Sequence, residues 1–481
     1  MSSQKHFINL FMGVGLNVVL GVITTPVITR IVAPEAYGNL SLFLLYANVF
    51  LIVAALGQDQ SYARFFYTRD EDEYKQYVLK MTSRIPLAIA LVCAAIVVCG
   101  YLIIPESKAV WLIFAVHIIF VMLGQFSNMA VRLKMRTTLY SIIINVQKLI
   151  YVGLAVFMVL VLKWDHLIAL TMATMIAQVS ICIIGVSAER KQWFAPKLSE
   201  EQHNEFKTAV DRKALMAFGI PFIFANLCNW VFTGADKIMI KAMASGTELG
   251  IYASAVSVVG IFSIITTTFC TIWGPMAIEK FEKDAGDTSF FIKATDYISV
   301  ILFTAGAGVV LFKDLIVYLL GSDYRTAVFL LPFLTLHPIM YSISETTVYG
   351  INFAKKTKLH IVIAATCATF NIALNFILIP EIGALGAAIA TGITYILFFI
   401  MRTVMSLRCF PVKYNLKKLA VTTVLYMAFV VYNSWHNIDF VSIIMFIVFA
   451  AVLIAGYRQS IRELLAMGLD YLKGILNKFK R

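Results

Sequence analysis

Residues 226–252 read NLCNWVFTGADKIMIKAMASGTELGIY, an apolar stretch that is long enough to cross a membrane yet carries Asp236, Lys237 and Lys241 near its end. An ionisable side chain inside a bilayer costs about 2.5 kcal/mol or more, so it usually faces a water-filled cavity or a partner. This stretch therefore predicts a membrane helix that borders a polar cavity.

The two lysines are four residues apart and share one face of the predicted helix with Thr233, Trp230 and Asn226. We interpret this face as the wall of the cavity. The alternative is that Lys241 extends to the membrane surface and that Asp236 pairs with a neighbouring cation.

The chain as a whole is too apolar for a soluble globular protein. Of its 481 residues, 60% are hydrophobic and 14% are charged, and the mean hydropathy is +0.83. We therefore predict an all-α polytopic membrane protein. The net charge of +13 does not indicate nucleic-acid binding, because the cations lie in short loops rather than in a basic domain. The seven cysteines lack the spacing of metal ligands, so we predict no metal site.

Windows of about 20 apolar residues predict about fourteen transmembrane helices. The first half holds six, at residues 8–31, 38–57, 84–104, 110–131, 139–162 and 166–187. The second half holds six more, at residues 215–242, 250–275, 295–318, 326–349, 359–379 and 383–403, and a final pair follows at 417–435 and 438–457. The first apolar run is too long for a cleavable signal peptide.

Lysine and arginine concentrate in alternate loops between these spans. On the opposite side of the membrane, the only lysines and arginines are Lys108, Lys163, Lys313 and Arg325. Because cytoplasmic loops carry the excess of positive residues, we place the N- and C-termini in the cytoplasm.

The longest hydrophilic stretch separates two halves of the chain. We predict an N-terminal six-helix lobe, a cytoplasmic linker, a C-terminal six-helix lobe, two additional transmembrane helices and a basic amphipathic tail that lies on anionic lipid, at residues 1–190, 191–214, 215–404, 405–457 and 458–481. The halves resemble each other: TRIVAPEAYGNLSLF (29–43) and IKAMASGTELGIYASA (240–255) each place a cation before a short loop and a glycine. Unless this match is a coincidence, the lobes are pseudo-repeats around a central lumen and indicate alternating access.

Lys148 is the most costly cation, because it falls about ten residues into its predicted span. It shares a polar stripe with Asn145, and we expect both to face the lumen. Arg30 ends the first span, where it either faces the lumen or extends to the membrane surface. We take Arg30, Lys148, Lys237 and Lys241 as candidate lumen cations.

Two acids lie clearly deep within the spans of the second half, Glu345 and Asp236. Glu345 either takes up a coupling ion, proton or sodium, or balances the charge of Lys237 or Lys148. His337 and Asn371 are neutral polar candidates for the lumen, although such residues more often join one helix to another. We find no enzyme motif and predict that the protein is not an enzyme.

Three segments carry a family resemblance: NVVLGVITTPVITRIVAPEAYGNLSLF (17–43), GQDQSYARFFY (57–67) and TGADKIMIKAMASGTELGIYASA (233–255). They resemble the bacterial polysaccharide flippases of the multidrug/oligosaccharidyl-lipid/polysaccharide flippase superfamily. The resemblance implies a flippase in the bacterial inner membrane that translocates undecaprenyl-pyrophosphate-linked repeat units of O-antigen, a lipopolysaccharide component, or of capsule or exopolysaccharide.

The resemblance also implies ion-coupled transport, no bound cofactor, and a pyrophosphate that meets the four lumen cations. It raises a polysaccharide polymerase and a chain-length regulator as candidate partners. Three alternatives remain open: a cation-coupled multidrug exporter, a peptidoglycan lipid-precursor flippase of the same superfamily, and a membrane scaffold without transport activity. An exporter of cationic drugs would need intramembrane carboxylates, which the first half nearly lacks.

Overall fold

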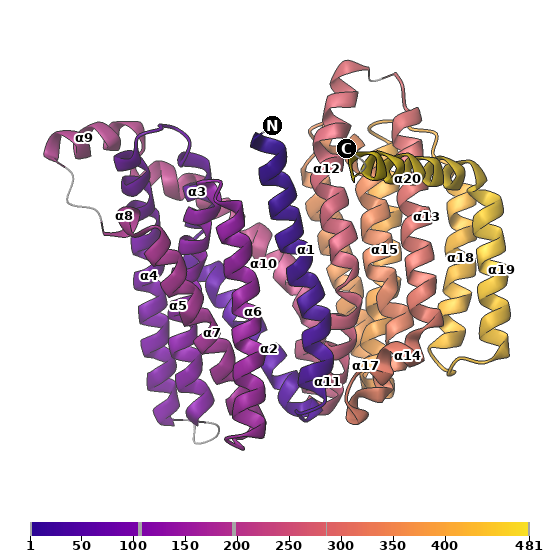
Figure 1. Ribbon diagram of the computed structural model, residues 1–481, viewed down its shortest axis with the longest axis horizontal. Coiled ribbons are helices and arrows are strands. Elements are labelled where there is room, and N and C mark those ends of the chain that lie inside the picture. The colour runs from indigo at the N-terminus through magenta and orange to yellow at the C-terminus, as the bar shows by residue number, and fades with distance from the viewer. Residues whose placement is uncertain (1, 104–107, 195–198, 285, 480–481) are drawn as a thin grey trace. The chain divides into compact units, whose positions relative to one another are not determined.

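The computed structural model describes residues 2–103, 108–194, 199–284 and 286–479, and the described part contains helices and no strand. Its contacts divide the chain into two compact units, Met1–Ala253 (unit 1) and Ser254–Arg481 (unit 2), which are described separately (Figure 1). Parts of the predicted linker, including Lys197, and the end of the predicted tail lie outside the described residues.

Unit 1 contains ten helices in its described part, and an eleventh begins at its end. They are α1 (Ser2–Thr29), α2 (Pro34–Ala55), α3 (Gln58–Phe65), α4 (Asp72–Ile103), α5 (Lys108–Leu133), α6 (Thr137–Leu160), α7 (His166–Ala188), α8 (Arg190–Trp193), α9 (Glu200–Ala209), α10 (Arg212–Met243) and α11 (Gly246–Val259). The boundary between the units falls within α11.

The long helices of unit 1 pack side by side: α4 on α5, α5 on α7, α7 on α6, and α6 on α1 (Figure 1). The helix α10 packs on α2 and α3. Glycine permits this last contact at Gly57, which has a φ of +66° and where an added Cβ would lie 1.9 Å from the carbonyl oxygen of Gly219. Any side chain at Gly57 would therefore separate α10 from the start of α3.

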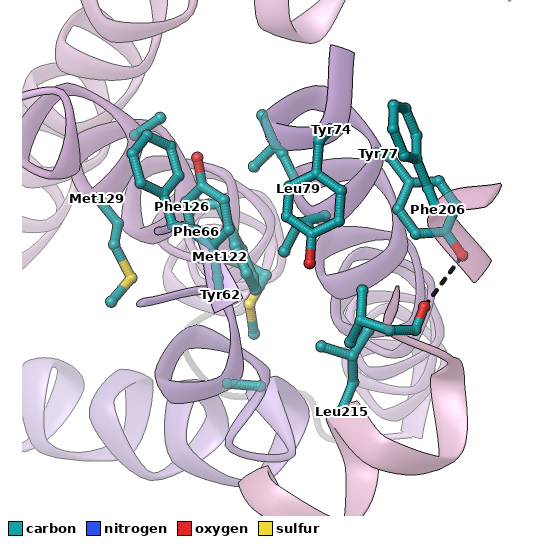
Figure 2. Packing of buried hydrophobic residues seen from close by; sticks show 14 of the residues in the cluster. Tyr62, Phe66, Tyr74, Tyr77, Leu79, Met122, Phe126, Met129, Phe206 and Leu215 are labelled. Atoms are coloured by element: carbon teal, nitrogen blue, oxygen red, sulfur yellow. Dashed lines mark hydrogen bonds between the residues drawn. The ribbon is translucent and has the colours of Figure 1, made fainter. Parts of the chain in front are cut away.

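An aromatic cluster fixes the linker helix α9 against α4. Figure 2 shows Phe206 of α9 beside Tyr74 and Tyr77 of α4, with ring centroids 5.4 and 5.9 Å apart. The hydroxyl of Tyr77 donates to the carbonyl of Val210 just after α9. The described part of the predicted linker is therefore folded onto unit 1.

Unit 2 continues with the end of α11 and the remaining helices. They are α12 (Phe262–Lys283), α13 (Ser289–Leu311), α14 (Lys313–Tyr318), the 3₁₀ helix η1 (Ser322–Phe329), α15 (Leu331–Thr347), α16 (Tyr349–Phe353), α17 (Lys358–Leu407), α18 (Leu416–Asn433), α19 (Phe440–Gly456) and α20 (Arg458–Phe479). The helix α15 packs on α17, α13 and α12, and α18 packs on α19.

The tail helix α20 bends by 83° from α19 and lies across the end of α13 (Figure 1). Polar contacts to α13 hold its first turns there: Glu463 lies 3.5 Å from Lys293, and the hydroxyl of Ser460 donates to Asp296, 3.5 Å away. Leu465 and Leu469 of α20 are exposed, and the lipid-bound amphipathic tail stays a prediction.

Each of the fourteen predicted spans falls on a helix, and the protein is an all-α polytopic membrane protein. By length and composition, eight described helices qualify as spans, or eleven if each bent pair counts as one. Several predicted spans differ from the observed helices. The eighth span is broken between Val259 and Phe262 with a bend of 50°, and the tenth is broken between Phe329 and Leu331 with a bend of 56°. The ninth ends at Leu311 rather than at residue 318. The eleventh and twelfth are joined in α17, with non-helical backbone at Ile382 and Gly383.

Candidate functional site

Lys148 lies on α6 and faces α1 of the same unit. Its Nζ donates to the backbone carbonyl of Asn17, 3.0 Å away, and the side chain is half-buried. Among the residues that the structure describes, no carboxylate forms an ion pair with Lys148. The carbonyl is a neutral partner, so the positive charge of Lys148 is not balanced there.

Asn145 also faces α1, where its amide donates to the carbonyl of Gly13 at 3.0 Å. The predicted polar stripe of α6 is therefore turned towards a neighbouring helix, and Asn145 has the role of a helix-to-helix contact. Whether this stripe also borders a lumen remains a prediction.

The charged face of α10 runs along α2. The indole nitrogen of Trp230 donates to the carbonyl of Leu45 at 3.0 Å, and Nζ of Lys241 lies 3.6 Å from a carboxylate oxygen of Glu35. Lys237 lies between these two positions in the sequence, is half-buried, and forms no ion pair with a described carboxylate. Lys241 thus lies beside the carboxylate of Glu35, and the charge of Lys237 interacts with that of its neighbour Asp236.

The two motifs that suggested a repeat meet directly within unit 1. A Cβ at Gly38 would lie 2.5 Å from the carbonyl oxygen of Gly246, and one at Gly250 would lie 1.8 Å from that of Pro34. The starts of α2 and α11 therefore touch through their backbones. Arg30 follows α1 in the same region and is exposed.

Asp236 is buried in unit 1 and accepts a hydrogen bond from the hydroxyl of Tyr252, 2.8 Å away. The partner comes from α11, so this bond ties the end of α10 to the helix that follows it. The expected pairing of Asp236 with a neighbouring cation stays a prediction beside this bond.

Glu345 of α15 forms an ion pair within unit 2. Its Oε1 lies 2.7 Å from Nη1 of Arg402 on α17, and the same guanidinium nitrogen donates to the hydroxyl of Ser344 at 2.7 Å. The side chains of Arg402 and Glu345 are only 10% and 16% exposed. Glu345 is therefore balanced by Arg402.

The remaining polar candidates also have neighbours in unit 2. The ring of His337 stacks on that of Tyr395 with centroids 4.0 Å apart. Asn371 is buried and accepts a hydrogen bond from the amide of Asn375, one turn further along α17. The first contact joins α15 to α17, and the second lies within α17.

Sequence reasoning missed Arg402, which lies near the end of the predicted span 383–403. A signal was present: the apolar pattern continues beyond Arg402 through Val404 and Met405 to Leu407, where α17 ends. A cation inside a continuing apolar helix needs a partner, and Glu345 on a neighbouring helix supplies it.

A family model described as "Polysaccharide biosynthesis protein" matches residues 3–281. No curated protein sequence matches the chain. The match covers more than half of the chain and includes every candidate residue of unit 1.

The fold is similar to that of lipid II flippase MurJ in its inward closed conformation, with 16% identity, 95% of this chain and 100% of that chain covered, and a TM-score of 0.67. It is also similar to an inward-facing multidrug resistance MATE family transporter of the MOP superfamily, with 13% identity, coverage of 81% and 93%, and a TM-score of 0.56. Both proteins are transporters rather than enzymes.

Proposed function

Since this chain belongs to the polysaccharide biosynthesis protein family and has the fold of MOP superfamily transporters, we propose that it is a flippase for undecaprenyl-pyrophosphate-linked oligosaccharide repeat units. We place it in the bacterial inner membrane with both termini in the cytoplasm, and we assign it ion-coupled alternating access. A polysaccharide polymerase and a chain-length regulator are its proposed partners.

The single observation that carries the substrate class is the unbalanced charge of Lys148. A lysine inside a membrane helix is costly, and at this position it bonds to Asn17, a neutral residue of α1. A pyrophosphate carries at least two negative charges, and each cation within about 4 Å contributes on the order of 4 kcal/mol at an effective dielectric near 20, before desolvation. Lys148 and Lys237 are therefore the proposed phosphate contacts.

Export of cationic drugs is disfavoured by the contacts of the acids. Glu345 pairs with Arg402, and Asp236 accepts from Tyr252, so neither carboxylate is presented without a partner. A drug cation would have to displace an existing bond at either position.

The test is complementation of a bacterial strain that lacks its own repeat-unit flippase. Lys148→Ala and Lys237→Ala should each lower export of the lipid-linked glycan, by about tenfold for every 1.4 kcal/mol of lost headgroup binding. Lys→Arg should retain part of the activity, because it keeps the charge but not the point-like ammonium. Membrane abundance should stay unchanged in Lys148→Ala, because the partner that this variant loses, Asn17, is neutral. A fall in abundance in Lys237→Ala would show instead that Lys237 balances Asp236. Full export by the double Lys→Ala variant would refute the proposed phosphate contacts.

A second strain, depleted of its peptidoglycan-precursor flippase, separates the two lipid-linked substrates. The proposal predicts rescue of the repeat-unit strain and no rescue of the peptidoglycan strain. The reverse result would assign the chain to peptidoglycan precursors instead.

A further inference from the structure

The helices α1 and α6 pack against each other (Figure 1), and side chains of one donate hydrogen bonds to backbone carbonyls of the other. Asn145 donates to Gly13, Asn17 donates to the carbonyl of Ile144 at 2.8 Å, and Lys148 donates to the carbonyl of Asn17 at 3.0 Å. The first two are contacts between neutral groups. The third holds an ammonium against the backbone of α1.

Gly21 lies one turn beyond Asn17, so in α1 its N–H shares the Asn17 carbonyl with the ammonium of Lys148. A Cβ built at Gly21 would lie 2.7 Å from Nζ of Lys148 and 3.8 Å from its Cε, and it would meet no other described group within 4 Å. The ammonium therefore occupies the space that any side chain at Gly21 would fill.

Helix stability does not explain this glycine, because glycine in a helix interior is less favourable than alanine. Close helix packing does not explain it either. At Gly13 of the same helix, a Cβ would collide with Oγ and Cβ of Ser141 and approach the Ser141 Cα at 3.1 Å. Gly21 meets only the flexible end of a lysine, which can move at low cost.

We propose that Gly21 is a positioning residue for Lys148: its missing side chain seats the ammonium against the Asn17 carbonyl and so sets where this cation meets an anionic phosphate. The ammonium has three donor hydrogens, and the backbone carbonyl and the side-chain oxygen of Asn17 take two of them, which leaves one for a phosphate oxygen. The position of the ammonium follows from the geometry alone. The identity of its ligand, a phosphate, rests on the proposed function.

The test replaces Gly21 with alanine and uses Gly15→Ala as the matched control, because a Cβ at Gly15 of the same helix would meet no described atom within 4 Å. Gly21→Ala should keep normal membrane abundance and thermal stability but lower glycan export towards the level of Lys148→Ala. Gly15→Ala should leave export unchanged. In the Lys148→Ala background, Gly21→Ala should cause no further loss, because the ammonium that it displaces is gone.

A second readout does not depend on transport. The purified proteins are treated with a membrane-permeant amine-reactive ester, and modification of Lys148 is followed by mass spectrometry. Gly21→Ala should speed this modification by about two- to tenfold, the effect of losing one hydrogen bond, while Gly15→Ala should not.

The outcomes separate the two ideas. Faster modification with full export in both Gly21→Ala and Lys148→Ala would keep the positioning role and refute the phosphate role of Lys148. The inference is overturned if Lys148 is modified at the same rate in Gly21→Ala as in Gly15→Ala. It is also overturned if Gly21→Ala lowers abundance or export in the Lys148→Ala background, because Gly21 would then be needed for packing.

Discussion

Arg402 and Glu345 are bound to each other across α17 and α15, with Nη1 and Oε1 2.7 Å apart. The guanidinium also lies 4.9 Å from the ring centroid of Phe398 and donates to Ser344. Each charge satisfies the other in an apolar bundle, where either alone would be costly.

This pair predicts strong coupling in stability. Glu345→Gln and Arg402→Gln should each lower the thermal stability of the purified protein, by up to about 3 kcal/mol, because each leaves one charge without its partner. The double variant should recover much of the loss. Thermal unfolding of the four proteins measures the coupling, and simple additivity of the two single effects would show that the pair is not a unit.

The same variants test Glu345 as the ion-coupling residue. If Glu345 takes up the coupling ion, Glu345→Gln should flatten the dependence of transport on pH or sodium at unchanged abundance. If Glu345 only neutralises Arg402, the dependence of transport on pH or sodium should persist in the protein that reaches the membrane. Transport assayed across pH and sodium concentration, normalised to abundance, decides between them.

Gly250→Ala should destabilise unit 1. Its Cβ would lie 1.8 Å from the Pro34 carbonyl oxygen, a backbone atom that cannot move without shifting α2. The control is Gly153→Ala, whose Cβ would meet no described atom within 4 Å and which should be neutral or slightly stabilising. Melting temperatures of the two purified variants give the comparison, and equal values would contradict the close backbone approach.

Lys313 predicts a pH effect on stability. It follows the end of α13, its side chain is buried, and its Nζ donates to the carbonyl of His436 at 2.6 Å. Burial lowers the pKa of Lys313 to about 8. Between about pH 8 and the ordinary lysine pKa near 10.4, the folded protein binds fewer protons than the unfolded chain, so stability should rise with pH.

Lys313→Met should remove this rise, because the variant has no titrating group at that position. The melting temperature of wild type and variant, measured from about pH 8 to about pH 10, isolates the contribution. An identical pH slope in both proteins would contradict it.

The predicted orientation is testable at two exposed residues of unit 2. In a cysteine-free background, Glu381→Cys should react with an impermeant thiol reagent in intact cells, and Lys356→Cys only after permeabilisation. Reaction of Lys356→Cys from outside would reverse the assigned topology.

The sequence by itself determined where the membrane helices lie. Their positions follow from runs of about 20 apolar residues, a local property that does not depend on distant contacts. The gap between the predicted spans 359–379 and 383–403 also matches the break at Gly383, where the backbone has a φ of +58° that glycine readily adopts. The sequence also showed that Lys148, Lys237 and Glu345 are energetically costly, because a charged side chain within an apolar run needs a water-filled cavity or a partner.

Only the tertiary structure decided which group each charge meets. The polar stripe of Asn145 and Lys148 identifies one face of α6, but α1, more than a hundred residues earlier, supplies the carbonyls that it contacts. Arg402 and Glu345 are 57 residues apart, and neither helix alone specifies the other. The physical reason is that a helical pattern defines a direction around its own axis, whereas the partner in that direction depends on how the helices pack.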